Sequence, residues 1–543
     1  MLITAHLIQV LLEDLLFSNS PKSSPSPPGP NMLERKRWLI LLVFSLISMM
    51  NEVIWISLSS VTNILQGYYE VTARQINWIS MIFSAMYVTV PVAVYTLNTY
   101  GLRVTIVLGA FCNTSASILR LIGYDRNGYV FALVGNALGG MGQCFLIFIP
   151  PTLSSIWFGE NERGRASSIG MLLNMLGVAV GFLMGSMFVP NSDDYEGVVK
   201  HGMFKTLLIQ AVACGFLLIL SIFVIKANPD SPPSRSRALS IQRQETKKEI
   251  RKLSTTTGEV PEHLTRDRSQ STGLFRNWKF LLTSVPFHLL TQAYGLNFGL
   301  FVTISTLLNQ MTIPHYPGRE QLIGIMGCCA VLCGLVGIFS VGVFVDKTHR
   351  FKMASVSTIT LSGCSLLAFV VVLRFTNNFT AMFCCYCIYG LFSYPYLSTG
   401  LEFTAEIMYP VKESILSFVL LFVGCLYAVL FTLGFGYVID RWGGDTAGCI
   451  LTALYALALL CVALVKGNLN RLNVDMSKDN VELGNDNATF NKKEPKDNAT
   501  VTPKEVIITK DDVLPPDTIN RSNKENNIER VEDVVIETCE GNS

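Results

Sequence analysis

The chain has 543 residues, of which 50% are hydrophobic and only 15% are charged. A soluble chain of this length would carry about a quarter charged residues, so the composition excludes an ordinary soluble protein and favours a membrane protein. The formal net charge of +2 excludes no class by itself, and we expect no nucleic-acid partner.

The first segment, residues 1–36, is predicted to be a cytoplasmic N-terminal tail. It joins an apolar run that contains Glu13 and Asp14 to a stretch rich in Ser and Pro. Because it lacks a basic start and a small-residue cleavage site, it is a poor signal peptide. Met32 is an alternative start of translation.

About twelve apolar stretches follow between Trp38 and Val465, six on each side of a polar insert. A membrane-spanning helix needs roughly 20 apolar residues. Only helices or closed barrels cross a bilayer, and the alternation of a barrel strand is absent. We therefore predict an all-α membrane protein with twelve transmembrane helices in two six-helix bundles, residues 37–226 and 279–466. This layout is typical of a transporter.

The insert at 227–278 and the end of the chain at 467–543 are rich in Ser, Thr, Asn, Lys and Glu. Such segments are too polar to bury a core, so we predict a cytoplasmic linker and a disordered cytoplasmic tail. Alternate loops between the apolar stretches carry several basic residues, and the intervening loops carry about one each. By the positive-inside rule both termini are cytoplasmic.

One short loop motif recurs in the two halves. The segment GVFVDKTHRFK places Asp346, Lys347 and Arg350 after the eighth apolar stretch, and YTLNTYGLR occupies the same place after the second with Asn98 at the acidic position. These segments resemble the major facilitator superfamily, whose loop motif has the form GxxxD(R/K)xGR. The resemblance implies two bundles that rock about a central site. We expect Asp346 to hold Arg350 and the neighbouring helix ends as a gate.

A narrower resemblance covers about residues 36–466. Its strings are WFGENE at 157–162, GLNFGLF at 295–301, STLLNQM with HYPG at 305–318, and EFTAEIMYP at 402–410. They are similar to the feline leukaemia virus subgroup C receptor-related family, solute carrier family 49. This resemblance implies a carrier of choline, ethanolamine or a related organic cation.

Polar and aromatic residues inside the apolar stretches are the candidates for substrate binding, because such groups are costly in a bilayer. They are Asn51, Glu52 and Trp55 on the first predicted helix, Asn136 and Gln143 on the fourth, and Tyr294, Asn297 and Phe301 on the seventh. Their spacings place each set near one helix face. An aromatic and amide site with one carboxylate suits a small cation, since a desolvated cation–π contact is worth ~2 kcal/mol.

The family resemblance implies a substrate-binding tryptophan on the first helix and a glutamine on the fourth, and Trp55 and Gln143 match these positions. Two positions differ. The family has a tyrosine where this chain has Val302, and a glutamine on the eleventh helix where this chain has Cys425. These differences weaken the assignment of choline itself.

Several candidates have a second interpretation. Trp55 could be an interfacial or packing aromatic, and Gln143 an interhelical hydrogen-bonding residue. Glu52 could bind a cation, couple transport to protons, or stay neutral in its buried setting. We expect Glu402 and Glu406, near the cytoplasmic end of the tenth helix, to pair with basic loop residues as part of a gate.

Haem export or import is the alternative substrate assignment, and a membrane sensor or receptor without net flux is the alternative function. Haem would require axial ligands. Among the six histidines, only His288 is predicted to lie well inside a span.

We expect no enzyme activity, cofactor or metal site, because the chain shows no catalytic triad, metal cluster or phosphate-binding glycine loop. The expected partners are membrane lipid and a small-molecule substrate, and the expected state is a monomer. The plasma membrane is the predicted location, with a mitochondrial or lysosomal membrane left open.

Overall fold

The computed structural model describes residues 36–159, 162–227, 229, 280–376, 378–409, 411 and 413–465. All of them belong to one compact unit, Met1–Lys478. Within these residues every regular element is a helix, which confirms the predicted all-α fold. The predicted linker and both predicted tails, with Met32, lie outside the described residues apart from the few positions at their edges.

The helices follow the predicted spans in order. The first six spans are α2 (Lys36–Ile56) with η1 (Ser59–Val61) and α3 (Thr62–Tyr69); α4 (Ala73–Ala85) with η2 (Met86–Thr89) and α5 (Val90–Tyr100); α6 (Leu102–Ile122); α7 (Tyr129–Leu146) with α8 (Ile149–Trp157); α9 (Arg163–Phe188); and η4 (Tyr195–Val199) with α10 (Lys200–Val224). The last six are α13 (Val285–Thr312), α14 (Glu320–Thr348), α15 (Phe351–Phe375), α16 (Phe379–Ser393) with α17 (Pro395–Ile407), α18 (Glu413–Trp442) and α19 (Gly444–Leu464).

Ten of these segments are long and apolar enough to cross a membrane. The two predicted spans outside this group are α13 and the pair α16 and α17. Helix α13 is long enough but carries many polar residues, among them His288, Gln292, Asn297, Asn309 and Gln310. The tenth span is divided at Tyr394. Both are helical, so each of the twelve predicted spans has its helix in the described part of the chain.

Proline accounts for most of the interruptions within spans. Helices α5, α8 and α17 each have a proline at their first or second position, namely Pro91, Pro150 and Pro395. Proline lacks the N–H that would bond to the preceding turn, so it is tolerated at a helix start and disrupts a helix interior. The first span is also interrupted, between α2 and η1, yet it contains no proline.

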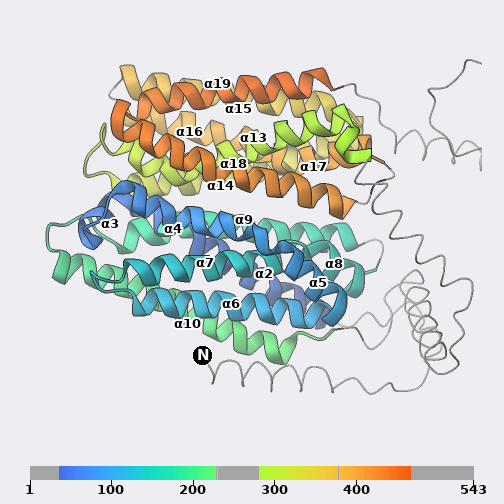
Figure 1. Ribbon diagram of the computed structural model, residues 1–543, viewed down its shortest axis with the longest axis horizontal. Coiled ribbons are helices and arrows are strands. Elements are labelled where there is room, and N and C mark those ends of the chain that lie inside the picture. Colours follow the sequence, from blue (N-terminus) through green and yellow to red (C-terminus); the bar gives the residue numbers. More distant parts are fainter. Residues whose placement is uncertain are drawn as a thin grey trace, which may run out of the picture. The chain divides into compact units, whose positions relative to one another are not determined.

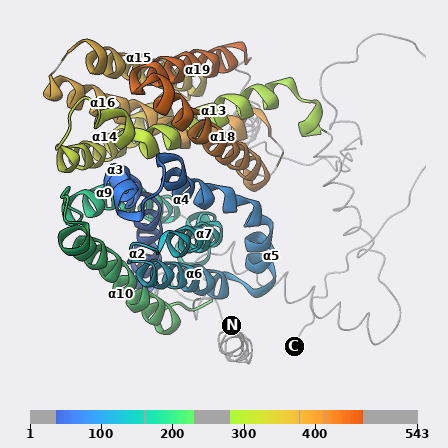
Figure 2. The same ribbon diagram turned by 60° about the vertical axis from the view of Figure 1, so that its left-hand side comes forward.

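The two halves repeat the same packing. In the first half α2 packs on α9 and α10, and α6 packs on α7 and α10. The corresponding pairs in the second half, α13 on α18 and α19, and α15 on α16 and α19, also pack together. Figures 1 and 2 show the halves as two separate groups of helices, the first in blue to green and the second in yellow-green to orange. The chain is therefore built from two similar six-helix bundles.

The bundles meet through two related pairs of helices, α9 with α14 and α4 with α18. Glycines allow α14 to approach α9 closely. A Cβ atom at Gly324 would lie 1.9 Å from Ser186 Oγ, and one at Gly327 would lie 2.7 Å from the ring of Phe182. Small residues at such contacts increase van der Waals packing between helices in a membrane.

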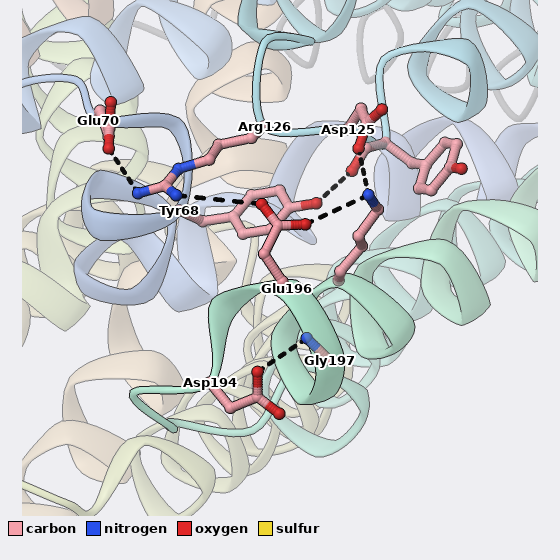
Figure 3. A network of polar contacts seen from close by, with 9 residues as sticks. Tyr68, Glu70, Asp125, Arg126, Asp194, Glu196 and Gly197 are labelled. Carbon is pink, nitrogen blue, oxygen red and sulfur yellow. Dashed lines mark hydrogen bonds and ion pairs between the residues drawn. The ribbon is translucent and has the colours of Figure 1, made fainter.

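We call the end at which α3 meets α4 the outer end, following the orientation predicted from the basic residues. Here a polar network ties the first bundle together (Figure 3). Arg126 pairs with Glu70 and Glu196, and Lys200 pairs with Asp125 at 2.6 Å and Glu196 at 3.4 Å. Single exposed ion pairs contribute little, but a network of several charges holds these loops in one arrangement.

We expect Gly177→Ala to destabilise the first bundle. A Cβ atom at Gly177 would lie 2.2 Å from the Met49 carbonyl oxygen and 2.9 Å from Glu52 Cβ. Such overpacking costs about 1 to 3 kcal/mol. Thermal unfolding of the purified protein in detergent measures the effect. Gly215→Ala on α10 is the matched control, because no atom lies within 4 Å of the added methyl group. Equal melting temperatures for the two variants would contradict the close α2–α9 packing.

Candidate substrate site

A buried carboxylate marks the middle of the first span. Glu52 lies on α2, and only 6% of its surface is exposed. Gln143 on α7 donates from Nε2 to Glu52 Oε1 over 2.6 Å, and Asn174 on α9, whose Nδ2 donates to Ser48 Oγ over 3.0 Å, lies near the carboxyl group. Within the described part of the chain no basic side chain forms an ion pair with Glu52. A neutral amide therefore binds an acidic group that has no basic counterpart among the described residues.

Trp55 lies one turn beyond Glu52 on the same face of α2. It is 5% exposed, and its ring centroid is 6.3 Å from that of Phe83 on α4. The indole Nε1 has no hydrogen-bond partner among the described residues. A buried polar group without a partner costs about 1 to 3 kcal/mol, so we expect this N–H to donate to a bound molecule.

The second bundle contributes aromatic residues to the same region. The phenol of Tyr394 and the thiol of Cys425 lie close enough to Glu52 to interact with it electrostatically. Phe301 packs edge-on against Tyr394, with ring centroids 4.7 Å apart. Trp55, Phe301, Tyr394 and Cys425 thus belong to one buried cluster that contains residues of both bundles.

The predicted stripe on α13 is present, although its members have different surroundings. Tyr294 donates from its hydroxyl to the Leu397 carbonyl oxygen over 3.3 Å and stacks on Phe298. Asn297 is fully buried, and neither atom of its amide has a partner among the described residues. The Oε1 atom of Gln143 is likewise unpartnered. Each bundle therefore offers at least one amide group with unused hydrogen-bonding capacity.

Asn51 is placed differently from its neighbour Glu52. Its Nδ2 donates to Asn113 Oδ1 on α6 over 2.6 Å and to the Gly139 carbonyl oxygen on α7 over 2.8 Å. Asn113 in turn donates to the Ile47 carbonyl oxygen on α2. Because both N–H bonds are used between helices, we assign Asn51 to bundle packing and leave it out of the proposed site.

The two positions that differ from the family pattern are both buried. Val302 lies on α13, and Cys425 lies on α18 within electrostatic reach of Glu52 and Cys144. A thiol is a weak donor and acceptor, whereas an amide has two strong donors and an acceptor oxygen. The carboxylate of Glu52 is therefore the strongest polar group in this part of the site.

The predicted gate residues lie at the opposite, inner end. Asp346 and Lys347 occupy the last turn of α14, and Arg350 precedes α15, with all three exposed. Asp346 and Arg350 form no ion pair with each other in the conformation described for these residues. Between them His349 has a left-handed backbone, with φ of 52°, and Gly101 has φ of 84° in the corresponding turn of the first bundle. The backbone ψ is 22° at His349 but −175° at Gly101, so the two motif segments turn differently.

Glu402 lies near the inner end of α17, and Glu406 lies one turn further along. The electrostatic neighbours of Glu402 are the carboxylates of Asp346, Glu406 and Glu413. Among the described residues no basic side chain forms an ion pair with Glu402, and the expected pairing stays a prediction. Like charges thus gather where the second bundle ends.

The outer end holds a set of hydrogen bonds between the bundles that the sequence analysis did not single out. Glu320 at the start of α14 is 4% exposed, and its Oε1 accepts from Asn63 Nδ2 at 3.1 Å and from Asn191 Nδ2 at 2.8 Å. Asn309 on α13 donates from Nδ2 to the Ser60 carbonyl oxygen at 3.0 Å. These bonds join the segment after the break in the first span to the second bundle.

A reciprocal amide pair lies beside them. Gln310 donates from Nε2 to Asn77 Oδ1 at 2.6 Å, and Asn77 donates from Nδ2 to Gln310 Oε1 at 3.3 Å. We call the whole set the outer contact. Its members are Ser60, Asn63, Asn77 and Asn191 in the first bundle and Asn309, Gln310 and Glu320 in the second. Amides and acids within apolar stretches were the signal that could have found most of them.

Comparison with known proteins agrees with this architecture. The family model of the Major Facilitator Superfamily matches residues 40–411. The D-xylose-proton symporter has a TM-score of 0.59 at 12% identity, covering 80% of this chain and 98% of that one. A partially occluded inward open structure of the xylose transporter XylE from E. coli has a TM-score of 0.58 at 11% identity, covering 78% and 98%. The chain is thus a transporter of the major facilitator superfamily, and not an enzyme.

Relatives define the family more narrowly. The choline/ethanolamine transporter FLVCR2 of Homo sapiens is 32% identical over 456 residues, which are 83% of this chain and 81% of that protein. The choline/ethanolamine transporter FLVCR1 of Mus musculus is 30% identical over 481 residues, which are 84% and 80%. The chain belongs to the feline leukaemia virus subgroup C receptor-related family. It is therefore an integral multi-pass membrane protein with a small-molecule substrate.

We expect Glu320→Ala to weaken the outer contact, because it removes the acceptor of two amide groups. Loss of hydrogen bonds to a charged group costs about 1.5 to 3 kcal/mol, which shifts a two-state equilibrium about ten- to a hundredfold. Spin labels are placed at Asp193→Cys and His315→Cys, which are exposed positions on the two bundles. Double electron–electron resonance measures the distance between the two labels, which we call the outer-end distance. Longer distances are expected in the variant.

The control is Glu413→Ala at the inner end of α18, which should leave the outer-end distance unchanged. An unaltered distance distribution in Glu320→Ala would show that this carboxylate does not hold the bundles together.

Proposed function

We propose that this chain moves choline, ethanolamine or a related ammonium compound across the membrane by alternating access. The observation that carries the proposal is the buried carboxylate of Glu52, one helical turn from the indole of Trp55 and without a basic partner among the described residues. An ionised group in such a setting is costly unless a charge or several hydrogen bonds compensate it. A cationic substrate supplies the missing charge.

The surrounding groups suit an ammonium compound that also carries a hydroxyl group. The face of Trp55 attracts a cation, and the contact strengthens when water is excluded. The unpartnered amide atoms of Gln143 and Asn297 can accept from or donate to a hydroxyl without adding charge. Tyr294 and Phe301 supply further aromatic surface from the second bundle.

We further propose that a primary ammonium group is favoured over a quaternary one. A primary ammonium has three N–H donors for the oxygens of Glu52 and Gln143, whereas a quaternary ammonium has none. The relatives named choline/ethanolamine transporters support both substrates, but Val302 and Cys425 stand where the family pattern implies a tyrosine and a glutamine. The site therefore has an acid, and it lacks the aromatic residue that the family pattern implies at Val302.

The outer contact supports an inward-facing state for the conformation described here. It joins the bundles at the outer end, while the motif residues Asp346 and Arg350 at the inner end are exposed and apart from each other. In alternating access the two ends close in turn around one central site. We propose that the ion pair of Asp346 and Arg350 forms when the inner end closes.

We also propose that the protein acts as a monomer in the plasma membrane, since one chain supplies both halves of the site.

The structure gives no support to the alternative of haem. His288 was the one histidine expected well inside a span, but it lies in the first turn of α13, is exposed, and shares a hydrogen bond of 2.8 Å with the Leu282 carbonyl oxygen. Its position corrects the expectation from the sequence. A histidine at that place is remote in sequence from Tyr294 and Phe301 and is already engaged with the backbone.

We expect Trp55→Ala to reduce the apparent affinity for choline and ethanolamine about five- to thirtyfold, which corresponds to roughly 1 to 2 kcal/mol of lost cation–π contact. Trp55→Phe should lose less, because an aromatic face remains. Uptake and efflux of radiolabelled choline, ethanolamine, haem and a vitamin amine in cells expressing each variant measure this. If the wild-type protein reaches the cell surface and transports none of these cations, the proposed function is refuted. Binding of a cation without flux would favour a sensor.

Glu52→Gln tests the role of charge. We expect ethanolamine to lose about tenfold or more in apparent affinity and choline to lose less, because only ethanolamine loses charged hydrogen bonds. Competition between the two labelled substrates gives the selectivity directly. Glu406→Gln, an acid at the inner end, is the control and should leave the ratio unchanged. An unchanged ratio in Glu52→Gln would exclude the carboxylate as a substrate ligand.

A further inference from the structure

The interruption of the first span needs an explanation other than proline. Helix α2 ends at Ile56, one residue after Trp55, and η1 begins at Ser59. Breaks without proline arise where serine residues or an inserted side chain compete for the backbone hydrogen bonds. Serine is present, since Ser60 donates from its hydroxyl to the Ser57 carbonyl oxygen at 2.9 Å.

An inserted side chain is also present, and it is charged. Arg120 on α6 is fully buried. Its guanidinium donates to the Ile54 carbonyl oxygen over 2.8 Å and to Ser57 Oγ over 3.1 Å. Gln210 on α10 donates to the same Ser57 Oγ over 3.1 Å. Side chains of two other helices in the bundle, α6 and α10, thus form hydrogen bonds at the end of α2.

The charge of Arg120 has a specific place in this arrangement. In the described part of the chain it forms no ion pair with a carboxylate, so the carbonyl end of α2 is its main compensation. The last carbonyl groups of a helix carry partial negative charge and lack partners within the helix, so a cation there is stabilising. Charged groups at this depth are expensive and are functional in most membrane proteins.

The neighbouring helices leave room for this contact. A Cβ atom at Gly135 on α7 would lie 2.6 Å from Arg120 Cγ. A Cβ atom at Gly185 on α9 would lie 2.1 Å from the Ser57 carbonyl oxygen and from Ser60 Oγ. The interruption is therefore enclosed by four helices, each with a side chain or a glycine that fits it.

The residues before and after the interruption belong to different parts of the molecule. Glu52 and Trp55 of the proposed substrate site precede it on α2. Ser60 and Asn63 of the outer contact follow it on η1 and α3. Whatever fixes the angle at the interruption fixes the position of the substrate residues relative to the bonds that hold the outer end closed.

We propose that Arg120 is a positioning residue that couples the substrate site to the outer contact. By holding Ile54 and Ser57, it sets the geometry of the interruption, so that movement at Trp55 is transmitted to Asn63. It does not touch the substrate. This inference rests on the proposed function only for the identity of the substrate.

The test compares Arg120→Met, which keeps much of the side-chain volume but removes the charge, with Arg120→Lys, which keeps the charge but not the two-pronged geometry. We expect Arg120→Met to lower the maximal rate of choline and ethanolamine uptake about tenfold or more, since hydrogen bonds from a charged group are lost. The KM should change less than about threefold, because substrate contacts remain. Arg120→Lys should recover part of the rate.

A second measurement does not depend on the substrate. The outer-end distance between labels at Asp193→Cys and His315→Cys should change in Arg120→Met without added ligand. Thr114→Val is the matched control, because Thr114 is buried on the same helix and bonds to the Ala110 and Cys214 carbonyl oxygens, away from the interruption. It should alter neither the rate nor the distance.

If Arg120→Met does not fold, Ser57→Ala tests the coupling role of Arg120. It removes the hydroxyl shared by Arg120 and Gln210 and leaves the buried charge in place. We expect the maximal rate to fall about two- to fivefold, as for the loss of one hydrogen bond. The outer-end distance should change in the same direction as in Arg120→Met. An unchanged outer-end distance in a folded Arg120→Met or Ser57→Ala protein overturns the coupling role. Failure of the wild type to carry choline or ethanolamine, with the distance still shifted by Arg120→Met, refutes only the proposed substrate.

Discussion

A polar group inside a bilayer must find its partner within the protein, and this constraint organises the whole molecule. Water is absent there, so each unsatisfied donor or acceptor costs several kcal/mol. The serine-rich interruption of the first span leaves backbone groups inside the bundle without their partners in a continuous helix. Arg120 and Gln210 satisfy part of this need at Ile54 and Ser57, and glycines let the helices close around them.

The same bundle holds one buried acid and one buried base that do not form an ion pair. Glu52 is bound by the neutral amide of Gln143, whereas Arg120 is bound to the end of a helix. A direct ion pair between them would neutralise both and would leave no charge for a substrate. Keeping the two apart lets the base stabilise a structural feature while the acid remains able to bind a cation.

The interface between the bundles combines two kinds of contact. Glycines at Gly324 and Gly327 allow close packing between α14 and α9, which rests on non-directional van der Waals contact. The amides and the Glu320 carboxylate at the outer end form directional bonds that hold in one arrangement only. A carrier that alternates between two states needs both, because sliding surfaces permit the movement and directional bonds define its end points.

The helices, the two halves and the family could all be predicted from the amino-acid sequence. Apolar length decides which segments cross a bilayer, and helical spacing decides that Glu52 and Trp55 share a face. The helix that each face contacts could not be predicted, because it depends on how the bundles pack. Gln143 reaches Glu52 from 91 residues away, Arg120 reaches Ile54 from 66, and Asn63 reaches Glu320 from 257. Asn51 and Glu52 are adjacent in the chain, yet one binds two helices of its own bundle and the other faces both bundles. Periodicity along one helix contains no information about its neighbours, so these partners follow from the packing of the bundles and not from any single segment.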